Sequence, residues 1–186
     1  MLNENSGYCS AKDCIPASYL ELGEQLGQWL AEHEHELVYG GATGGLMTRV
    51  SRAYRQTTQR LQKATNRVIG VVPARVIAAG RKDNHCDELI EVRTMCERKE
   101  RMREIADCFI CLPGSYGTLD EMMDVISSGV VGEHHKPIYV LNHDHFYDDL
   151  QALARHMHVL DFLPKEEQYK PIFVNTLDEL YGSILS

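Results

Sequence analysis

The chain has 186 residues, of which 25% are charged, and a formal net charge of -8 with the histidines neutral. This length suits a single domain spanning residues 1–186, and the acidic charge disfavours nucleic acid or an anionic membrane as the main partner. No stretch approaches the ~20 apolar residues of a membrane span, and the N-terminus lacks the basic and apolar regions of a signal peptide, so we expect a cytoplasmic protein.

The first half of the chain alternates helical periodicity with short apolar runs. Residues 16–31 predict a helix, because Leu20, Leu26 and Leu30 recur at near-helical spacing and Pro16 suits a first helical turn. The next expected elements are a strand at 36–41, a helix at 46–61, a strand at 67–77 broken at Pro73, and a strand at 88–95.

The second half continues the alternation. Thr118 with Glu121, and Thr176 with Glu179, have the spacing of a capping box, in which the first residue caps the helix. The expected elements are helices at 96–107, 118–130, 146–160 and 176–185, strands at 107–113 and 136–142, and a short edge strand at 170–175.

Buried strands that alternate with helices at this spacing are typical of α/β proteins. We therefore expect one Rossmann-like, doubly wound parallel sheet with helices on both faces. Ligands of such sheets bind beyond the carboxyl ends of the strands. The turns that lead from strands into helices are thus the places to search for a site.

Cysteine and histidine spacing gives no strong metal or redox signal. Cys108 and Cys111 have C-x-x-C spacing, but they lie in an apolar run, so we interpret them as reduced core residues. His143 and His145 lie in a turn-rich segment without a third ligand in view. We expect no metal site.

The first glycine-rich turn joins the strand at 36–41 to the next helix and contains Gly40, Gly41, Gly44 and Gly45. Glycines allow close approach of the backbone to a ligand and leave helix N–H groups facing an anion. The turn is neither a G-x-G-x-x-G fingerprint nor a P-loop, which needs a lysine. A ligand loop and a tight structural turn both remain open here.

The second turn follows the apolar strand at 107–113 and reads Pro-Gly-Ser-Tyr-Gly-Thr. Gly114, Ser115, Gly117 and Thr118 could offer N–H groups and hydroxyls to a phosphate at the positive end of a helix. Glu121 would repel that phosphate. Spacing alone favours a capping role for Glu121 over a task on another part of the ligand.

Arg98 and Lys99 lie in a charged helix in which Glu97 has the spacing to pair with Arg101. A solvated helix surface explains most of these charges. However, the helix follows a predicted strand end, so its first turn is expected at the same sheet edge as the two glycine turns. Arg98 and Lys99 could then reach a ligand, and a small anion is compatible with an acidic protein.

Three motifs, YGGATGGLM, TMCERKERM and PGSYGTLDE, occur in the same order and with the same spacing as those of the Lonely Guy family. The chain resembles this family, the cytokinin riboside 5′-monophosphate phosphoribohydrolases formerly labelled lysine decarboxylases, from about Tyr8 to Leu180. The resemblance implies a Rossmann-like fold, a homodimer, no cofactor, and hydrolysis of a nucleoside 5′-monophosphate to a free base and ribose 5-phosphate.

The resemblance also assigns roles to residues. It places the family's catalytic arginine on Arg98 and its catalytic glutamate on Glu121, which would stabilise an oxocarbenium-like transition state. The substrate-binding residues that it implies are Gly40, Gly41, Gly45, Met95, Lys99, Gly114, Ser115, Gly117, Thr118 and Asp124.

The chain departs from the family pattern at several positions. Ser115 replaces a glycine, and a positive φ there would cost roughly 1–2 kcal/mol. Ser127 and Ser128 stand where Thr-Trp is usual, which predicts a roomier or more polar pocket wall. The polar segment NENSGYCS lacks the apolar character of a central strand, so we expect the start to be trimmed or the middle of the sheet to be built differently.

Hydrolysis of a purine nucleoside monophosphate is the leading hypothesis. The alternative is a nucleotide-binding module with little turnover. Ser115 favours it, as does the first loop, which has Ala42 and Thr48 where glycines are common in the family. Arg98 together with Glu121 favours catalysis. A nicotinamide-dependent oxidoreductase would need the dinucleotide fingerprint, which the first glycine-rich turn does not supply. A pyridoxal-dependent decarboxylase would need a pocket lysine with phosphate and ring partners, and no lysine stands out.

Overall fold

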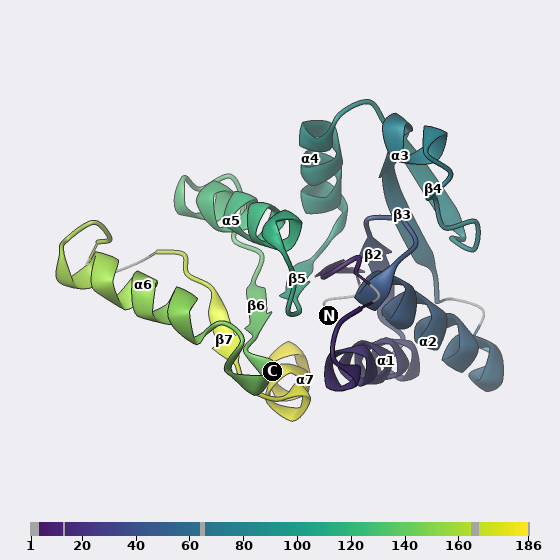
Figure 1. The fold of residues 1–186 in the computed structure, drawn as a ribbon, viewed down its shortest axis with the longest axis horizontal. Coiled ribbons are helices and arrows are strands. Elements are labelled where there is room, and N and C mark those ends of the chain that lie inside the picture. Colours follow the sequence, from purple (N-terminus) through teal and green to yellow (C-terminus); the bar gives the residue numbers. More distant parts are fainter. Residues whose placement is uncertain (1–3, 13, 64–65, 165–167, 186) are drawn as a thin grey trace.

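The structure, a computed structural model, describes residues 4–12, 14–63, 66–164 and 168–185. Strands and helices alternate along the described chain (Figure 1). The strands are β1 (Glu4–Tyr8), β2 (Glu36–Tyr39), β3 (Val68–Pro73), β4 (Glu88–Val92), β5 (Cys108–Cys111), β6 (Ile138–Leu141) and β7 (Ile172–Val174). The helices are α1 (Ala17–Glu32), α2 (Gly45–Leu61), α3 (Ala74–Ala78), α4 (Met95–Ile105), α5 (Tyr116–Val130), α6 (Asp148–Val159) and α7 (Leu177–Leu185), with a 3-10 turn at His143–His145.

The strands form one sheet in the order β4-β3-β2-β1-β5-β6-β7. Every neighbouring pair is parallel. The chain builds outward from β1 to β4, then returns to the other side of β1 and continues to β7, so the direction of winding switches between β1 and β5. The prediction of a doubly wound parallel sheet is confirmed, and ligands of this architecture bind at the switch point.

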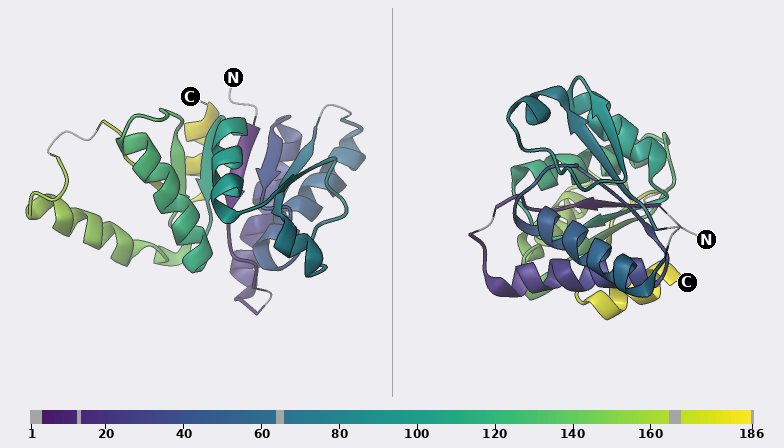
Figure 2. Two further views of the ribbon diagram at one scale, coloured as in Figure 1. Left: turned by 90° about the horizontal axis from the view of Figure 1, so that it is seen from above. Right: turned by 90° about the vertical axis from the view of Figure 1, so that its right-hand side faces the viewer.

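Helices cover both faces of the sheet, as expected (Figures 1 and 2). The core on one face combines α1, α2 and α7 with alternate strand residues such as Leu37 and Ile110. The core on the other face combines α4 and α5 with Val38 and Phe109. Adjacent strand residues therefore serve opposite cores, which is the alternation of side chains that a strand imposes.

The polar segment at the N-terminus forms the central strand, so the expectation drawn from its composition was wrong. β1 lies between β2 and β5 and pairs with both. Asn5 and Ser6 are buried, and the Asn5 carboxamide oxygen accepts a hydrogen bond from Cys108 Sγ at 2.9 Å. Burial penalises only polar groups that lack partners, and β1 has a sheet ladder on each side. A strand can thus be central without being apolar.

Two other sequence expectations about local structure are confirmed, whereas the strand expected at 67–77 ends at Pro73 and is followed by α3. Cys108 and Cys111 are free and buried in the core. Thr176 Oγ1 accepts a hydrogen bond from Glu179 N at 3.2 Å at the start of α7, while the Glu179 carboxylate accepts one from Asn175 N at 2.7 Å. No helix in the described ranges is both long and apolar enough to cross a membrane.

Candidate functional site

A buried ion pair joins α4 to α5 at the carboxyl edge of the sheet. The Arg98 guanidinium donates from Nη1 to Glu121 Oε1, and its Nε donates to the Val71 carbonyl at 3.1 Å. Arg98 is 8% exposed and Glu121 is 7% exposed. The structure therefore brings together the two residues to which the resemblance assigns catalysis, although they are 23 positions apart in the sequence.

Gly40 lies directly against this ion pair. A Cβ atom at Gly40 would collide with the Arg98 guanidinium, with Cζ only 3.1 Å away. The first glycine of the turn after β2 is thus required by the close approach of backbone and arginine. The glycine turn and Arg98 share one site, as their expected positions at the sheet edge predicted.

Glu121 does not cap α5, so the capping interpretation was wrong. α5 begins at Tyr116, with Ser115 as its N-cap, and Thr118 is a buried residue of the first turn. Glu121 lies one turn further along and faces Arg98. The capping-box spacing was misleading because the helix begins two residues earlier than the apolar periodicity indicated.

Burial raises the pKa of the Glu121 carboxyl above its ordinary value, although the Arg98 charge and hydrogen bond oppose the shift. Desolvation disfavours the charged form of a carboxyl, whereas a cation favours it. A carboxyl with a raised pKa beside a cation at a sheet edge is the kind of group that functional sites use.

The turn after β5 is free of backbone strain at Ser115. Ser115 has φ -97° and ψ -164°, which is extended backbone. The cost that a positive φ would have imposed on serine is therefore absent, because Ser115 does not adopt one. Gly114, in contrast, is required by packing, because a Cβ there would lie 2.6 Å from Thr118 Cβ. The Ser115 side chain makes no capping hydrogen bond, so it does not occupy the first N–H groups of α5, which have no partner within the helix.

The remaining glycines of the first turn shape the backbone. Gly41, Gly44 and Gly45 have positive φ angles of 59°, 130° and 47°. Gly44 N donates to Thr48 Oγ1 at 2.7 Å, and a Cβ at Gly45 would lie 2.6 Å from Lys12 N. Gly45 therefore permits the close approach of the loop after β1.

Lys99 is held in a network of charges between α4 and α5. Its Nζ lies 3.0 Å from Asp120 Oδ1 and 3.2 Å from Asp124 Oδ1, and Arg103 also pairs with Asp124. Burial alone would lower the pKa of Lys99, but the two carboxylates raise it above its ordinary value. In this structure the predicted binding residues Lys99 and Asp124 neutralise each other.

α4 begins at the predicted binding residue Met95, after a capping residue. Thr94 Oγ1 accepts a hydrogen bond from Glu97 N at 3.1 Å, and the Glu97 carboxylate pairs with Arg93 at 2.7 Å. The expected pair of Glu97 with Arg101 was wrong. Glu97 instead takes part in the N-terminal cap of α4, where the first N–H groups have no partner within the helix.

A cavity of about 240 Å³ lies between the loop after β1 and the turn after β5. Sequence reasoning missed its β1 side, because the polar β1 was not recognised as a strand whose end would contribute to the site. The cavity is lined by Ser10, Lys12, Ile15, Pro16, Tyr19, Leu46, Pro113, Gly114, Ser115 and Phe146.

Comparison with solved structures supports the fold. The molybdenum cofactor binding protein of Rippkaea orientalis matches with a TM-score of 0.68 and 20% identity, covering 100% of this chain and 99% of the other. The Moco carrier protein of Chlamydomonas reinhardtii matches with a TM-score of 0.69 and 14% identity, covering 100% and 96%. At these identities the likeness concerns the fold alone.

Comparison with curated proteins identifies relatives at higher identity. A probable cytokinin riboside 5′-monophosphate phosphoribohydrolase of Oryza sativa subsp. japonica is 40% identical over 145 residues, which are 78% of this chain and 56% of the relative. A cytokinin riboside 5′-monophosphate phosphoribohydrolase of Arabidopsis thaliana is 33% identical over 183 residues, covering 89% and 77%. The chain spans 56%, 60% and 55% of the length of three of its rice relatives.

A family model described as "Possible lysine decarboxylase" matches residues 51–184, which include α4, the Arg98–Glu121 pair and the turn after β5. The resemblance drawn from the three motifs is thereby confirmed. The chain belongs to this family, and the curated members that it matches are named cytokinin riboside 5′-monophosphate phosphoribohydrolases.

Proposed function

We propose that the protein hydrolyses the N-glycosidic bond of a purine nucleoside 5′-monophosphate, of the adenosine or cytokinin type, to the free base and ribose 5-phosphate. The observation that carries this proposal is the buried Arg98–Glu121 pair on the Gly40 backbone. The names of the relatives point to the same reaction. The reaction needs water as its only co-substrate, and we propose no cofactor or metal.

Cleavage of a ribosyl C–N bond develops positive charge at C1′ of the ribose. The Glu121 carboxylate would stabilise that charge or orient the water that attacks C1′. Arg98 would bind the phosphate or ribose oxygens with its planar guanidinium. The phosphate itself would accept hydrogen bonds at the positive N-terminus of α5, where Gly114, Ser115, Gly117 and Thr118 lie.

The proposed roles are tested by Glu121→Gln and Arg98→Ala, assayed with AMP and with isopentenyladenosine monophosphate. Each variant is expected to lower kcat/KM by about a hundredfold or more, because each removes a charge that acts in the transition state. Glu104→Gln is the control, since Glu104 lies on α4 and pairs with exposed Arg101 on that helix. Equal activity of Glu121→Gln and the control would refute the role of Glu121.

The alternative of a nucleotide-binding module without turnover loses one of its supports. It rested partly on Ser115, whose extended backbone conformation makes serine compatible with the turn. A binding module also gives no reason for a buried acid with a raised pKa beside the arginine. We therefore retain hydrolysis as the proposed function.

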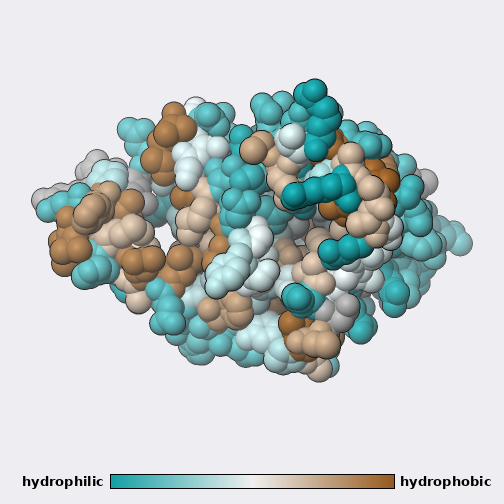
Figure 3. Space-filling model, turned by 45° about the horizontal axis from the view of Figure 1, so that its top comes forward, coloured by the Kyte–Doolittle hydropathy of each residue, from teal (hydrophilic) through white to brown (hydrophobic). Residues whose placement is uncertain are grey.

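We further propose that two copies of the chain associate as a homodimer, and that nucleic acid is not a partner of this acidic protein. Hydrophobic side chains gather near the ends of α5 and α6 (Figure 3). Val130, Val131, Val159 and Phe162 are 56%, 73%, 78% and 77% exposed. Exposed apolar side chains that gather on a surface can mark a protein interface.

A further inference from the structure

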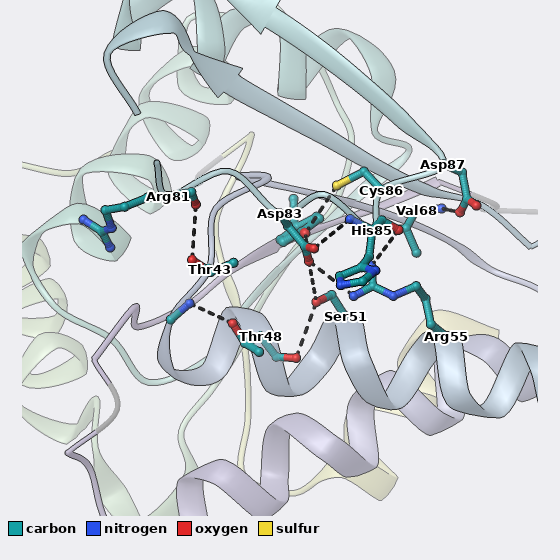
Figure 4. A network of polar contacts seen from close by, with 12 residues as sticks. Thr43, Thr48, Ser51, Arg55, Val68, Arg81, Asp83, His85, Cys86 and Asp87 are labelled. Carbon is teal, nitrogen blue, oxygen red and sulfur yellow. Dashed lines mark hydrogen bonds and ion pairs between the residues drawn. The ribbon is translucent and has the colours of Figure 1, made fainter. Parts of the chain in front are cut away.

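The segment that joins α3 to β4 lies over the first glycine turn (Figure 4). Thr43 N donates to the Arg81 carbonyl at 2.8 Å, Ala42 and Lys82 form an antiparallel bridge, and Asp83 N donates to the Gly41 carbonyl at 2.7 Å. Three consecutive residues on each side are thus joined backbone to backbone. The position of the glycine turn depends on this segment.

The Asp83 carboxylate is the centre of the contact. It is 4% exposed and accepts hydrogen bonds from Tyr39 Oη at 2.7 Å, His85 N at 2.9 Å, Ser51 Oγ at 3.3 Å and Arg55 Nη2 at 3.3 Å. Burial alone would raise the pKa of Asp83, but these donors and the Arg55 charge lower it below its ordinary value. Asp83 is therefore an ionised, fully partnered group.

Asp83 holds both chain neighbours of Gly40. Its carboxylate binds the Tyr39 side chain, and its N–H binds the Gly41 carbonyl. Gly40 in turn lies against the Arg98 guanidinium so closely that a Cβ atom does not fit. A shift of the turn toward Arg98 would press on the guanidinium, and a shift away would leave it unsupported.

We propose that Asp83 is a positioning residue that fixes Arg98 through the backbone of Gly40. The proposal rests on the proposed function for its catalytic consequence, since displacement of a reacting group by about 1 Å can cost a hundredfold in rate. Asp83 contacts Arg98 only through Gly40 and its neighbours, so its effect on the reaction is indirect.

Asp83→Asn is the first test, because it keeps the side-chain shape but removes the negative charge and turns one acceptor oxygen into an amide donor. That donor faces His85 N at the Oδ1 position, or Tyr39, Ser51 and Arg55 at the Oδ2 position. Asp87→Asn is the matched control. Asp87 belongs to the same segment and accepts a hydrogen bond from Val68 N at 2.7 Å, away from the glycine turn. With AMP, assayed well below the melting temperature of each variant, Asp83→Asn is expected to lower kcat at least tenfold and Asp87→Asn less than twofold.

A second measurement requires neither ligand nor turnover. The Arg98 Nε–H group donates to Val71 O, so its NMR signal reports where the guanidinium lies and how fast its proton exchanges. Asp83→Asn is expected to shift this signal and speed its exchange, whereas Asp87→Asn leaves both unchanged. An unchanged Arg98 signal in Asp83→Asn would overturn the proposal, whatever the activity.

Two further comparisons distinguish failure of the Asp83 proposal from failure to fold and from failure of the proposed function. If Asp83→Asn does not fold, Tyr39→Phe removes only the Tyr39 hydroxyl, with its hydrogen bonds to Asp83 and Cys86, and is expected to move the Arg98 signal in the same direction. If the parent protein hydrolyses neither AMP nor isopentenyladenosine monophosphate, the proposed function fails, while the NMR comparison still decides whether Asp83 positions Arg98.

Discussion

At the scale of single residues, the Arg98–Glu121 pair is costly for folding. Removing two charges from water carries a desolvation penalty that their attraction only partly offsets, so a buried ion pair is weak support for stability. The pair also requires Gly40, which limits the choice of residue in the turn. These costs are explained if the pair acts on a substrate.

The raised pKa of Glu121 predicts the pH dependence of the reaction. If the ionised carboxylate is the active form, kcat/KM rises with pH as Glu121 loses its proton, and this occurs above the ordinary value of 4.5 because burial raises the pKa. The measurement is a pH profile of kcat/KM for AMP, with Glu121→Gln as the comparison. A profile in which the variant keeps the same acid limb would contradict the assignment.

Sequence analysis identified the residues of this site unevenly. Arg98 and Glu121 were found because the family motifs contain them, whereas spacing alone favoured a cap for Glu121. Asp83 was missed, because the polar stretch RKDNHCD reads as an ordinary loop and its partners Tyr39, Ser51 and Arg55 lie 44, 32 and 28 positions away. Long-range hydrogen bonds of this kind leave no local periodicity.

At the scale of elements, the contact between α1 and α2 depends on glycines. A Cβ at Gly27 would lie 3.0 Å from Tyr54 N and even closer to the Val50 carbonyl, so the two helix backbones touch. Alanine is preferred over glycine within a helix by ~1 kcal/mol. At Gly27, however, the backbone of α2 leaves no room for the additional methyl group.

Gly27→Ala is therefore expected to lower the free energy of unfolding by about 1–3 kcal/mol, because overpacking outweighs helix propensity. Gly182→Ala is the matched control, since a Cβ there meets no atom within 4 Å in the described part of the chain. It is expected to be neutral or to stabilise by up to ~1 kcal/mol. Denaturant unfolding of both variants is the measurement, and a stabilised Gly27→Ala would contradict the packing argument.

His134 makes the segment after α5 sensitive to acid. Its Nε2 donates to the Val125 carbonyl at 3.0 Å, and its ring lies against Phe109 and Tyr169. Burial lowers the pKa of His134 below 6.5, and the nearby Arg103 and Lys136 charges add to the shift. The unfolded chain then binds the proton more readily, so the contribution to stability is present above about pH 6.5 and is lost as pH falls below it.

The free energy of unfolding is expected to decrease between about pH 6.5 and pH 5 in the parent protein, and less steeply in His134→Gln, which retains a donor for Val125. His156→Gln is the control, because His156 is an exposed histidine of α6. Identical slopes in the parent and in His134→Gln would exclude His134 as the source of the acid sensitivity.

At the scale of the whole molecule, alternation of strands and helices was enough to predict the doubly wound sheet. The central place of β1 was not predictable from composition, because the strand pairs with β2 and β5 and buried Asn5 finds a hydrogen-bond partner in Cys108 on β5. For the same reason the cavity beside the turn after β5 was not predicted, because the loop that follows β1 forms one of its walls. The alternation of strands and helices thus predicted the parallel sheet, whereas the central strand was determined by pairing between segments far apart in the sequence.

The proposed dimer predicts that charges on the exposed apolar surface will separate the two copies. Val159→Asp combined with Phe162→Ser is expected to shift the mass measured by light scattering from dimer to monomer, because both side chains are exposed in the single chain. Leu61→Asp is the control, since Leu61 is an exposed apolar residue at the end of α2. A parent protein that is already monomeric would refute the homodimer.

The central claim is that this protein cleaves the bond between base and ribose. Chromatography of AMP incubated with the pure protein tests it most directly, because adenine, adenosine and AMP separate and ribose 5-phosphate can be quantified. The account predicts that adenine and ribose 5-phosphate appear in equal amounts, and that Glu121→Gln abolishes both. AMP and isopentenyladenosine monophosphate that both remain intact, or release of the nucleoside and phosphate instead, would contradict it.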